Sequence, residues 1–222
     1  EKYPDRQALI FPDSQLSYSE LAALSQSYAR AMIGHGLKRG EHVGVLAINR
    51  PEYIALLFAC MFCGTVAVLL NARFRVQELR HATTHCDLKW IFVGQNEGVP
   101  HAARYLEAYP TLADAPPGQP LAVPAAPNLE CAVALDAFES PGFLAFTDFL
   151  AEENLATPEQ LDARRQEVVA SELALIMFTS GTTSLPKGCM LTQESVFRTS
   201  LAMRNRLSLT IKDCMWDPLP MF

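Results

Sequence analysis

Residues whose types suit phosphate binding are concentrated in residues 179–188, which read Thr-Ser-Gly-Thr-Thr-Ser-Leu-Pro-Lys-Gly. Gly181 has no side chain to keep backbone N–H groups away from an anion. The short hydroxyl side chains of Ser180, Thr182, Thr183 and Ser184 add donors, and Lys187 adds a compact positive charge. This combination predicts a loop that binds phosphate.

The place of this loop in the chain supports the same chemistry. It follows an apolar run at residues 173–178, which is typical of a strand buried on both faces. A helix is expected to begin near Thr192. Because open α/β sheets usually bind ligands at the carboxyl ends of such strands, we expect the loop to face a ligand.

One nucleotide-binding pattern has a similar spacing. Lys187 lies six positions after Gly181, the offset found in G-x-x-x-x-G-K-[ST]. Pro186 replaces the glycine before the lysine, however, and Gly188 replaces the magnesium-binding hydroxyl residue after it. Since proline has no N–H to donate, we predict a different phosphate loop. A P-loop NTPase remains an alternative, which acid-independent ATPase activity would favour.

The ten residues 179–188 closely resemble the T-S-G-[ST]-T-G-x-P-K-G motif of adenylate-forming enzymes, a family of acyl- and aryl-CoA synthetases, amino-acid adenylation domains and luciferases. The departure is Ser184, where the motif has glycine. If that position needs a positive φ, serine adds strain and stiffens the loop. A surface turn rich in serine and threonine is the alternative without function.

The resemblance implies an ATP-dependent acyl-CoA ligase. A carboxylate attacks the α-phosphate of ATP, and a thiol, usually that of CoA, then displaces AMP. Thr182, Thr183 and Lys187 are implied as catalytic, and Thr179 as a ligand of Mg²⁺. The implied nucleotide-binding residues are Thr179, Ser180, Gly181, Thr182, Thr183, Ser184, Lys187 and Gly188.

The resemblance covers residues 1–222 as the first part of the family's large N-terminal domain. Residues 216–222 resemble the segment that enters the acyl-binding region, and both ends of the sequence look cut. Later motifs and the C-terminal domain are absent, so the fragment is expected to be inactive alone. An amino-acid or aryl-acid adenylation domain, and a non-catalytic nucleotide-binding or interaction fragment, are the alternatives.

The order of expected elements predicts the fold class. Ser17-x-x-Glu20 and Thr157-x-x-Gln160 have the spacing of capping boxes that open helices, and Pro51 suits the first turn of another helix. Short strands alternate with these helices, which predicts an α/β fold with a mainly parallel sheet and flanking helices. The expected strands are residues 8–11, 15–18, 43–48, 66–70, 88–93, 131–135 and 173–178, and a further helix covers residues 76–86.

Two stretches could be misinterpreted. Residues 53–72 carry no charge for about the 20 residues that a membrane helix needs. Gly64-Thr65 interrupts them, so a buried helix, a tight turn and a buried strand are predicted instead. Residues 110–128 are rich in alanine and proline, with six prolines between positions 110 and 127. Because proline removes backbone donors, we predict a surface loop within the same domain.

Composition limits the partners and the compartment. Half of the residues are hydrophobic and 19% are charged, as in ordinary globular proteins. The net charge of −6 and the lack of a basic block disfavour nucleic acid as a partner. Six scattered cysteines fit reduced thiols in a cytoplasmic protein. The family resemblance adds fatty acid metabolism and a small carboxylic acid, ATP and CoA as partners.

Two spacings common in metal sites receive a structural interpretation. Cys60-x-x-Cys63 lies in the most apolar stretch and has no second C-x-x-C partner, so buried thiols are predicted. His81 and His85 share one helix face, and Cys86 could add a third ligand. A solvated helix face is preferred there, because Ala82 occupies the place of the glutamate in H-E-x-x-H.

Overall fold

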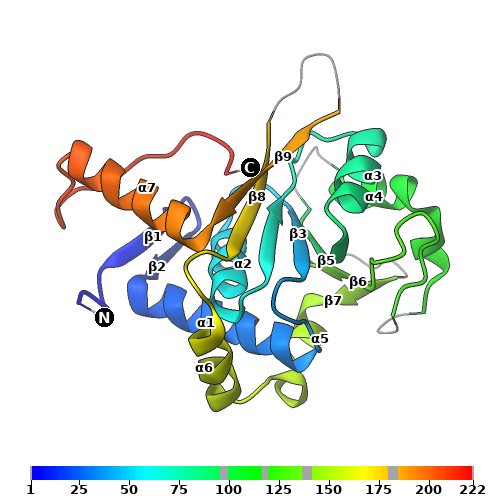
Figure 1. The fold of residues 1–222 in the computed structure, drawn as a ribbon, viewed down its shortest axis with the longest axis horizontal. Helices are drawn as coiled ribbons and strands as arrows, with labels where there is room; N and C mark the ends of the chain where they lie inside the picture. The colour runs from blue at the N-terminus through cyan, green and yellow to red at the C-terminus, as the bar shows by residue number, and fades with distance from the viewer. Residues whose placement is uncertain (1, 96–99, 117–119, 137–141, 180–184, 222) are drawn as a thin grey trace.

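The computed structural model describes residues 2–95, 100–116, 120–136, 142–179 and 185–221, and Figure 1 shows how their helices and strands are arranged. Residues 2–95 contain β1 (Gln7–Phe11), β2 (Ser14–Ser17), α1 (Tyr18–Gly34), β3 (His42–Leu46), α2 (Pro51–Cys63), β4 (Val66–Leu69), α3 (Val76–His85) and β5 (Leu88–Val93). The described ranges from residue 100 onward contain α4 (His101–Ala108), η1 (Pro110–Asp114), β6 (Cys131–Ala134), β7 (Phe143–Ala145), α5 (Phe146–Phe149), η2 (Glu152–Asn154), α6 (Pro158–Glu167), β8 (Leu173–Thr179), β9 (Lys187–Thr192) and α7 (Gln193–Arg206).

The strands form one large sheet and one small ribbon. Seven strands pair in the order β7-β6-β5-β3-β4-β8-β9, and β1 pairs with β2 separately. All neighbours in the large sheet are parallel except β8 and β9, which are antiparallel. The predicted α/β fold with a mainly parallel sheet is therefore confirmed.

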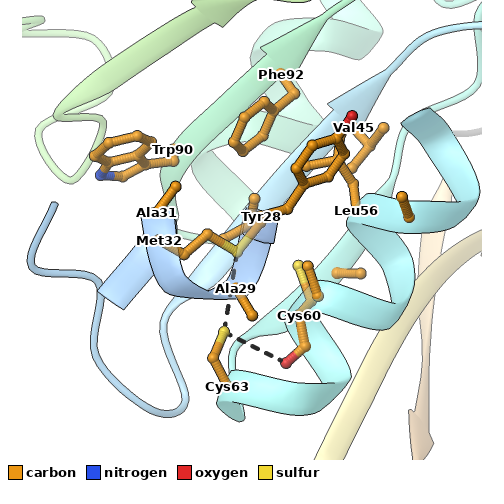
Figure 2. Close-up of a cluster of buried hydrophobic side chains, with 14 of the residues drawn as sticks. Tyr28, Ala29, Ala31, Met32, Val45, Leu56, Cys60, Cys63, Trp90 and Phe92 are labelled. Carbon is orange, nitrogen blue, oxygen red and sulfur yellow. Dashed lines mark hydrogen bonds between the residues drawn. The ribbon is translucent and has the colours of Figure 1, made fainter. Parts of the chain in front are cut away.

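Helices cover both faces of the central strands. Alternate side chains of each strand point to opposite faces and so pack in different apolar clusters. Val43 and Val45 of β3 pack with buried residues of α1 and α2 on one face, and Figure 2 shows part of this cluster. Val66 and Val68 of β4 join buried residues of α3 and α4 on the other face. Polar side chains are consequently directed to the ends of these strands.

Both predicted capping boxes are present. The Ser17 N–H donates to Oε2 of Glu20 at 2.7 Å, and the Glu20 N–H donates to Oγ of Ser17 at 3.2 Å. The hydrogen bonds that the Ser17 N–H and the Ser17 hydroxyl donate to the Glu20 carboxylate lower the pKa of this carboxyl. Thr157 and Gln160 make the same reciprocal pair at the start of α6, at 2.7 and 3.3 Å. Each box satisfies N–H groups that the first helical turn leaves unpaired.

The charge-free stretch divides as the sequence predicts. α2 ends at Cys63, Gly64 takes a left-handed conformation with φ of 72°, and β4 begins at Val66. The left-handed residue ends the helix after 13 residues. Within the described ranges, no helix combines the length and apolar character needed to cross a membrane.

The prediction of a surface loop at residues 110–128 is wrong in part. Its described backbone is irregular apart from η1, as the prolines require. Leu112, Leu121 and Val123 are nevertheless buried against the cluster formed with α3 and α4. Proline removes backbone donors but does not prevent neighbouring apolar side chains from packing, so this segment covers the sheet instead of leaving it.

The two thiols of the Cys60-x-x-Cys63 sequence are structural. Both are fully buried on α2, and burial raises their pKa values. Sγ of Cys63 lies 3.9 Å from Sδ of Met32 and donates to the Cys60 carbonyl at 3.7 Å (Figure 2). The predicted packing role is confirmed.

We expect iodoacetamide to alkylate Cys189 and Cys214, which are exposed, in the native protein. Cys60 and Cys63 should react only after unfolding, because alkylation needs an accessible thiolate. Cys86 should also react slowly, since burial raises its pKa to about 11. Peptide mass spectrometry with and without urea measures this. Labelling of Cys60 at the rate of Cys189 would contradict the described packing.

Candidate functional site

The phosphate-binding motif lies on the hairpin formed by β8 and β9. β8 ends at Thr179, and β9 begins at Lys187 and runs back beside it. Figure 1 shows the two strands together on one side of the sheet. Thr179, Lys187 and Gly188 are described. The other predicted binding residues, Ser180, Gly181, Thr182, Thr183 and Ser184, lie outside the described residues.

The base of the hairpin is tightly fitted. Phe178 pairs with Gly188, and Thr179 pairs with Lys187. Oγ1 of Thr179 donates to the Lys187 carbonyl at 3.3 Å. A Cβ added to Gly188 would lie 2.9 Å from Cγ2 of Ile176, so this position requires glycine for the close approach of the two strands.

Residues on the α3 side of the sheet hold both arms of the hairpin. The ring of Phe178 meets that of Phe74 edge to face, with centroids 5.5 Å apart. Nε2 of His81 lies 3.0 Å from the Pro186 carbonyl. Each arm therefore contacts side chains of the segment that follows β4.

The hairpin contradicts the P-loop alternative. A P-loop continues into a helix, whose N-terminal N–H groups bind the phosphates. Lys187 here begins a strand, and α7 starts six residues later at Gln193. The resemblance between the two lysine spacings is therefore not accompanied by the same structure.

Lys187 has the charge and exposure that an anion site needs. It is exposed, and within the described part of the chain no carboxylate lies at ion-pair distance from it. It also lies at the carboxyl end of the parallel strands, where ligands bind in open α/β sheets. Its ammonium group is thus available to an anionic ligand.

A family model described as AMP-binding enzyme matches residues 1–222, the whole length of this chain. The chain belongs to the AMP-binding enzyme family. This match confirms the resemblance to adenylate-forming enzymes that residues 179–188 indicated.

Known members of the family are similar over nearly all of this chain. The acyl-CoA ligase SID4 of Ajellomyces capsulatus is 28% identical over 224 residues, which cover 100% of this chain and 36% of that protein. The N-terminal domain of FACL13 from Mycobacterium tuberculosis, solved with an inhibitor, has a TM-score of 0.75 at 24% identity and covers 99% of this chain and 48% of that one.

A second solved structure is o-succinylbenzoate CoA synthetase (MenE) of Bacillus subtilis, in complex with the acyl-adenylate intermediate OSB-AMP. Its TM-score is 0.65 at 20% identity, and the match covers 99% of this chain and 47% of that one. At these identities the two solved structures support the fold alone. The chain spans about a third to a half of the length of the proteins it matches.

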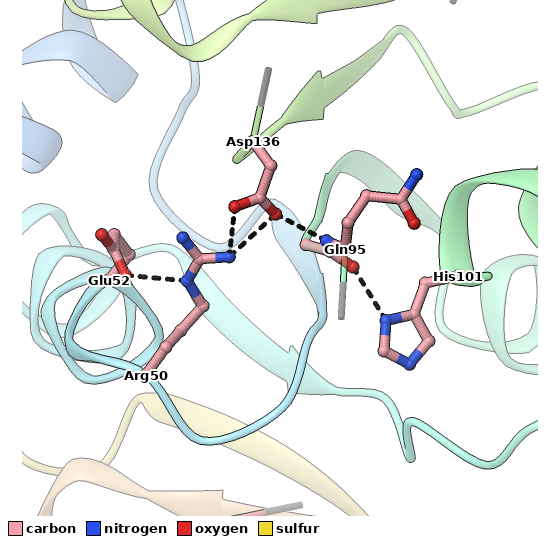
Figure 3. A network of polar contacts seen from close by, with 6 residues as sticks. Arg50, Glu52, Gln95, His101 and Asp136 are labelled. Carbon is pink, nitrogen blue, oxygen red and sulfur yellow. Dashed lines mark hydrogen bonds and ion pairs between the residues drawn. The ribbon is translucent and has the colours of Figure 1, made fainter. Parts of the chain in front are cut away.

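This member of the AMP-binding enzyme family has a second polar cluster at the same edge of the sheet (Figure 3). Nη1 of Arg50 donates to both carboxylate oxygens of Asp136 at 2.9 and 2.8 Å, and its Nε donates to Glu52 at 2.8 Å. The Gln95 N–H donates to the same Asp136 carboxylate at 2.6 Å. These contacts join the segments that follow β3, β5 and β6.

The charge of Arg50 is stabilised where it lies. Burial acts to lower the pKa of its guanidinium, but hydrogen bonds to Glu52 and Asp136 outweigh it and the pKa is raised. Sequence reasoning missed this cluster, because Arg50 and Asp136 are 86 residues apart and meet only through the strand order. Polar residues following consecutive strands were the available clue.

The two histidines of α3 in this family member lie against each other. Their rings stack with centroids 4.9 Å apart, and His81 hydrogen-bonds to Pro186. Within the described ranges, no group of three or more His, Cys, Asp or Glu residues could hold a metal ion. Cys86 is buried, and its side chain lies near Gly188.

We expect Asp136→Asn to lower the free energy of unfolding by about 1–2 kcal/mol, because the partly buried Arg50 loses a charged partner. Asp162→Asn is the matched control. Asp162 pairs with Arg165 at 3.7 Å with both side chains largely exposed, so its loss should cost less than about 0.5 kcal/mol. Urea denaturation measures both, and equal effects would contradict a stabilising role for the cluster.

Proposed function

We propose that this chain is the nucleotide-binding part of an acid–thiol ligase that activates a carboxylic acid with ATP and transfers the acyl group to CoA. The observation that carries this proposal is Lys187, an exposed lysine at the carboxyl end of the parallel strands, within the family motif. In this proposal residues 1–222 form the first part of a larger N-terminal domain.

The first reaction brings two anions together. A carboxylate oxygen attacks the α-phosphorus of ATP, the bond to the bridging oxygen breaks, and pyrophosphate leaves with the developing charge. A positive group near the leaving phosphates stabilises this charge. Lys187 supplies it in the proposal, and Ser180, Gly181, Thr182 and Thr183 add backbone and hydroxyl donors. Their assignment, with Ser184 and Gly188 as further nucleotide-binding residues, rests on the motif.

Mg²⁺ bound with ATP would neutralise part of the phosphate charge. Thr179 fits the role of a ligand. Its hydroxyl hydrogen is directed to the Lys187 carbonyl, which leaves the oxygen lone pairs available. Hydroxyl oxygen is among the hard ligands that Mg²⁺ prefers.

In the second proposed reaction the thiol sulfur of CoA attacks the acyl carbonyl carbon and AMP leaves with the bonding electrons. The names of the relatives, an acyl-CoA ligase and a CoA synthetase, support CoA as acceptor. We also propose the cytoplasm as compartment, because all six cysteines are free thiols.

We expect Lys187→Ala to lower kcat/KM for ATP in ATP–pyrophosphate exchange by about 10- to 100-fold, since one preorganised cation is lost from the leaving phosphates. The assay uses the complete gene product with fatty, aromatic and amino acids. Lys38→Ala is the matched control, because this exposed lysine precedes β3 at the opposite end of the sheet. Undiminished exchange in Lys187→Ala would refute the proposed function.

The 222-residue chain alone is expected not to form an adenylate. The resemblance assigns the ribose-binding aspartate, a Mg²⁺-binding glutamate and the mobile catalytic lysine to later parts of the family's pattern. The measurement is AMP-ester formation from ATP and the same panel of acids, with the complete gene product as the positive control. Product formation by the isolated chain would contradict this expectation.

A further inference from the structure

Side chains from other elements hold both backbone carbonyls that flank the α-carbon of Lys187. The Pro186 carbonyl, on the preceding residue, lies 3.0 Å from Nε2 of His81 on α3. The carbonyl of Lys187 itself accepts a hydrogen bond at 3.3 Å from Oγ1 of Thr179 on β8. The backbone of the lysine is thus held from two directions.

The contact of His81 with the Pro186 carbonyl restrains ψ of Pro186, the backbone torsion that the proline ring does not fix. The pyrrolidine ring fixes φ of Pro186, and the peptide bond to Lys187 is planar. The direction of the Pro186 carbonyl therefore reports ψ of Pro186 and sets the position of the Lys187 α-carbon. A donor that holds this carbonyl controls where the lysine side chain begins.

The ring of His81 is the donor in this contact. A carbonyl oxygen can only accept, so Nε2 carries the proton and donates it. The ring stacks on that of His85 with an interplanar angle of 15°. Buried Leu79 and Ala82 fix α3 against the sheet, so the donor is carried by a packed element.

Other polar side chains of α3 have different partners. Nε of Arg80 donates to the Ala108 carbonyl at 2.8 Å, and Oγ1 of Thr84 donates to the Arg80 carbonyl at 2.8 Å. Among the described residues of α3, His81 makes the side-chain hydrogen bond to residues 185–192. This contact therefore singles out one residue of the helix.

We propose that His81 is a positioning residue for the ATP-dependent reaction: it holds the Pro186 carbonyl so that Lys187 meets the nucleotide phosphates in one orientation. The inference rests on the proposed function, since it concerns the lysine assigned to those phosphates. His81 itself touches neither ATP nor the acid in this proposal.

A double-mutant cycle in the complete gene product tests it by ATP–pyrophosphate exchange. His81→Leu removes the donor and replaces the ring with an apolar side chain of similar size. It should lower kcat/KM for ATP about three- to tenfold, the effect of one hydrogen bond, with KM for the acid unchanged. In the Lys187→Ala background it should change the rate by less than about twofold, because His81 acts through Lys187.

Two variants separate the hydrogen bond from packing. His81→Gln keeps an N–H donor of similar reach and should restore most of the activity. His85→Leu removes the stacked ring and leaves the donor, so it should lose less than His81→Leu. If His81→Leu instead lowers Tm strongly and keeps its full effect in the Lys187→Ala background, its role is general stability and the proposal is overturned.

Hydrogen exchange gives a readout that is independent of activity. The amides of residues 187–192 should exchange faster in His81→Leu, while those of β3 and β5 stay unchanged. Equal exchange would overturn the inference. If Lys187→Ala leaves the reaction unchanged, the proposed function fails and this inference falls with it. A normal reaction in His81→Leu beside an impaired Lys187→Ala overturns this inference alone.

Discussion

Burial of both faces of the parallel sheet is the constraint on which the other features depend. Strand residues alternate between two apolar clusters, one with α1 and α2 and one with α3 and α4. The backbone groups of these strands pair with each other. Because both faces of the sheet are covered by apolar side chains, polar side chains are placed at the strand ends. Because β3, β5, β6 and β8 are connected by parallel pairings, their carboxyl ends lie at one edge. This arrangement explains why Arg50, Asp136 and Lys187 all lie at that edge.

The hairpin of β8 and β9 uses that edge in a particular way. A helix N-terminus binds phosphate through several N–H groups and a dipole. A strand that begins at Lys187 provides one point charge on a flexible side chain. The position of this charge therefore depends more on the direction of the backbone than it does at a helix N-terminus. The close approach at Gly188, the ring contact of Phe178 and the hydrogen bonds to the two carbonyls limit this direction.

The cluster around Arg50 has a structural task at the same edge. It joins the segments after three neighbouring strands, and every charge in it has a partner of opposite sign. Its partly buried position makes these pairs stronger than exposed ones. Lys187 differs, since no described carboxylate neutralises it. One edge of the sheet therefore contains a paired arginine that stabilises the fold and a lysine that has no ion-pair partner among the described residues and suits a ligand.

Local patterns in the sequence determined a large part of this protein. The capping boxes at Ser17 and Thr157, the helix end at Gly64 and the alternation of strands and helices act within a few residues, so their outcome needs no distant partner. The motif at residues 179–188 identified the family for the same reason. α4, β7 and β9 escaped prediction, because they are short or contain glycine and form through contacts with neighbouring elements.

Tertiary structure alone decided the contacts between distant segments. The pairing of Arg50 with Asp136, the burial of Leu112 and Leu121, and the contact of His81 with Pro186 each join residues far apart in the chain. They depend on the strand order and on which face each helix covers. Neither is encoded by residue types within one segment, because both arise from the joint packing of all the elements on the two faces of one sheet.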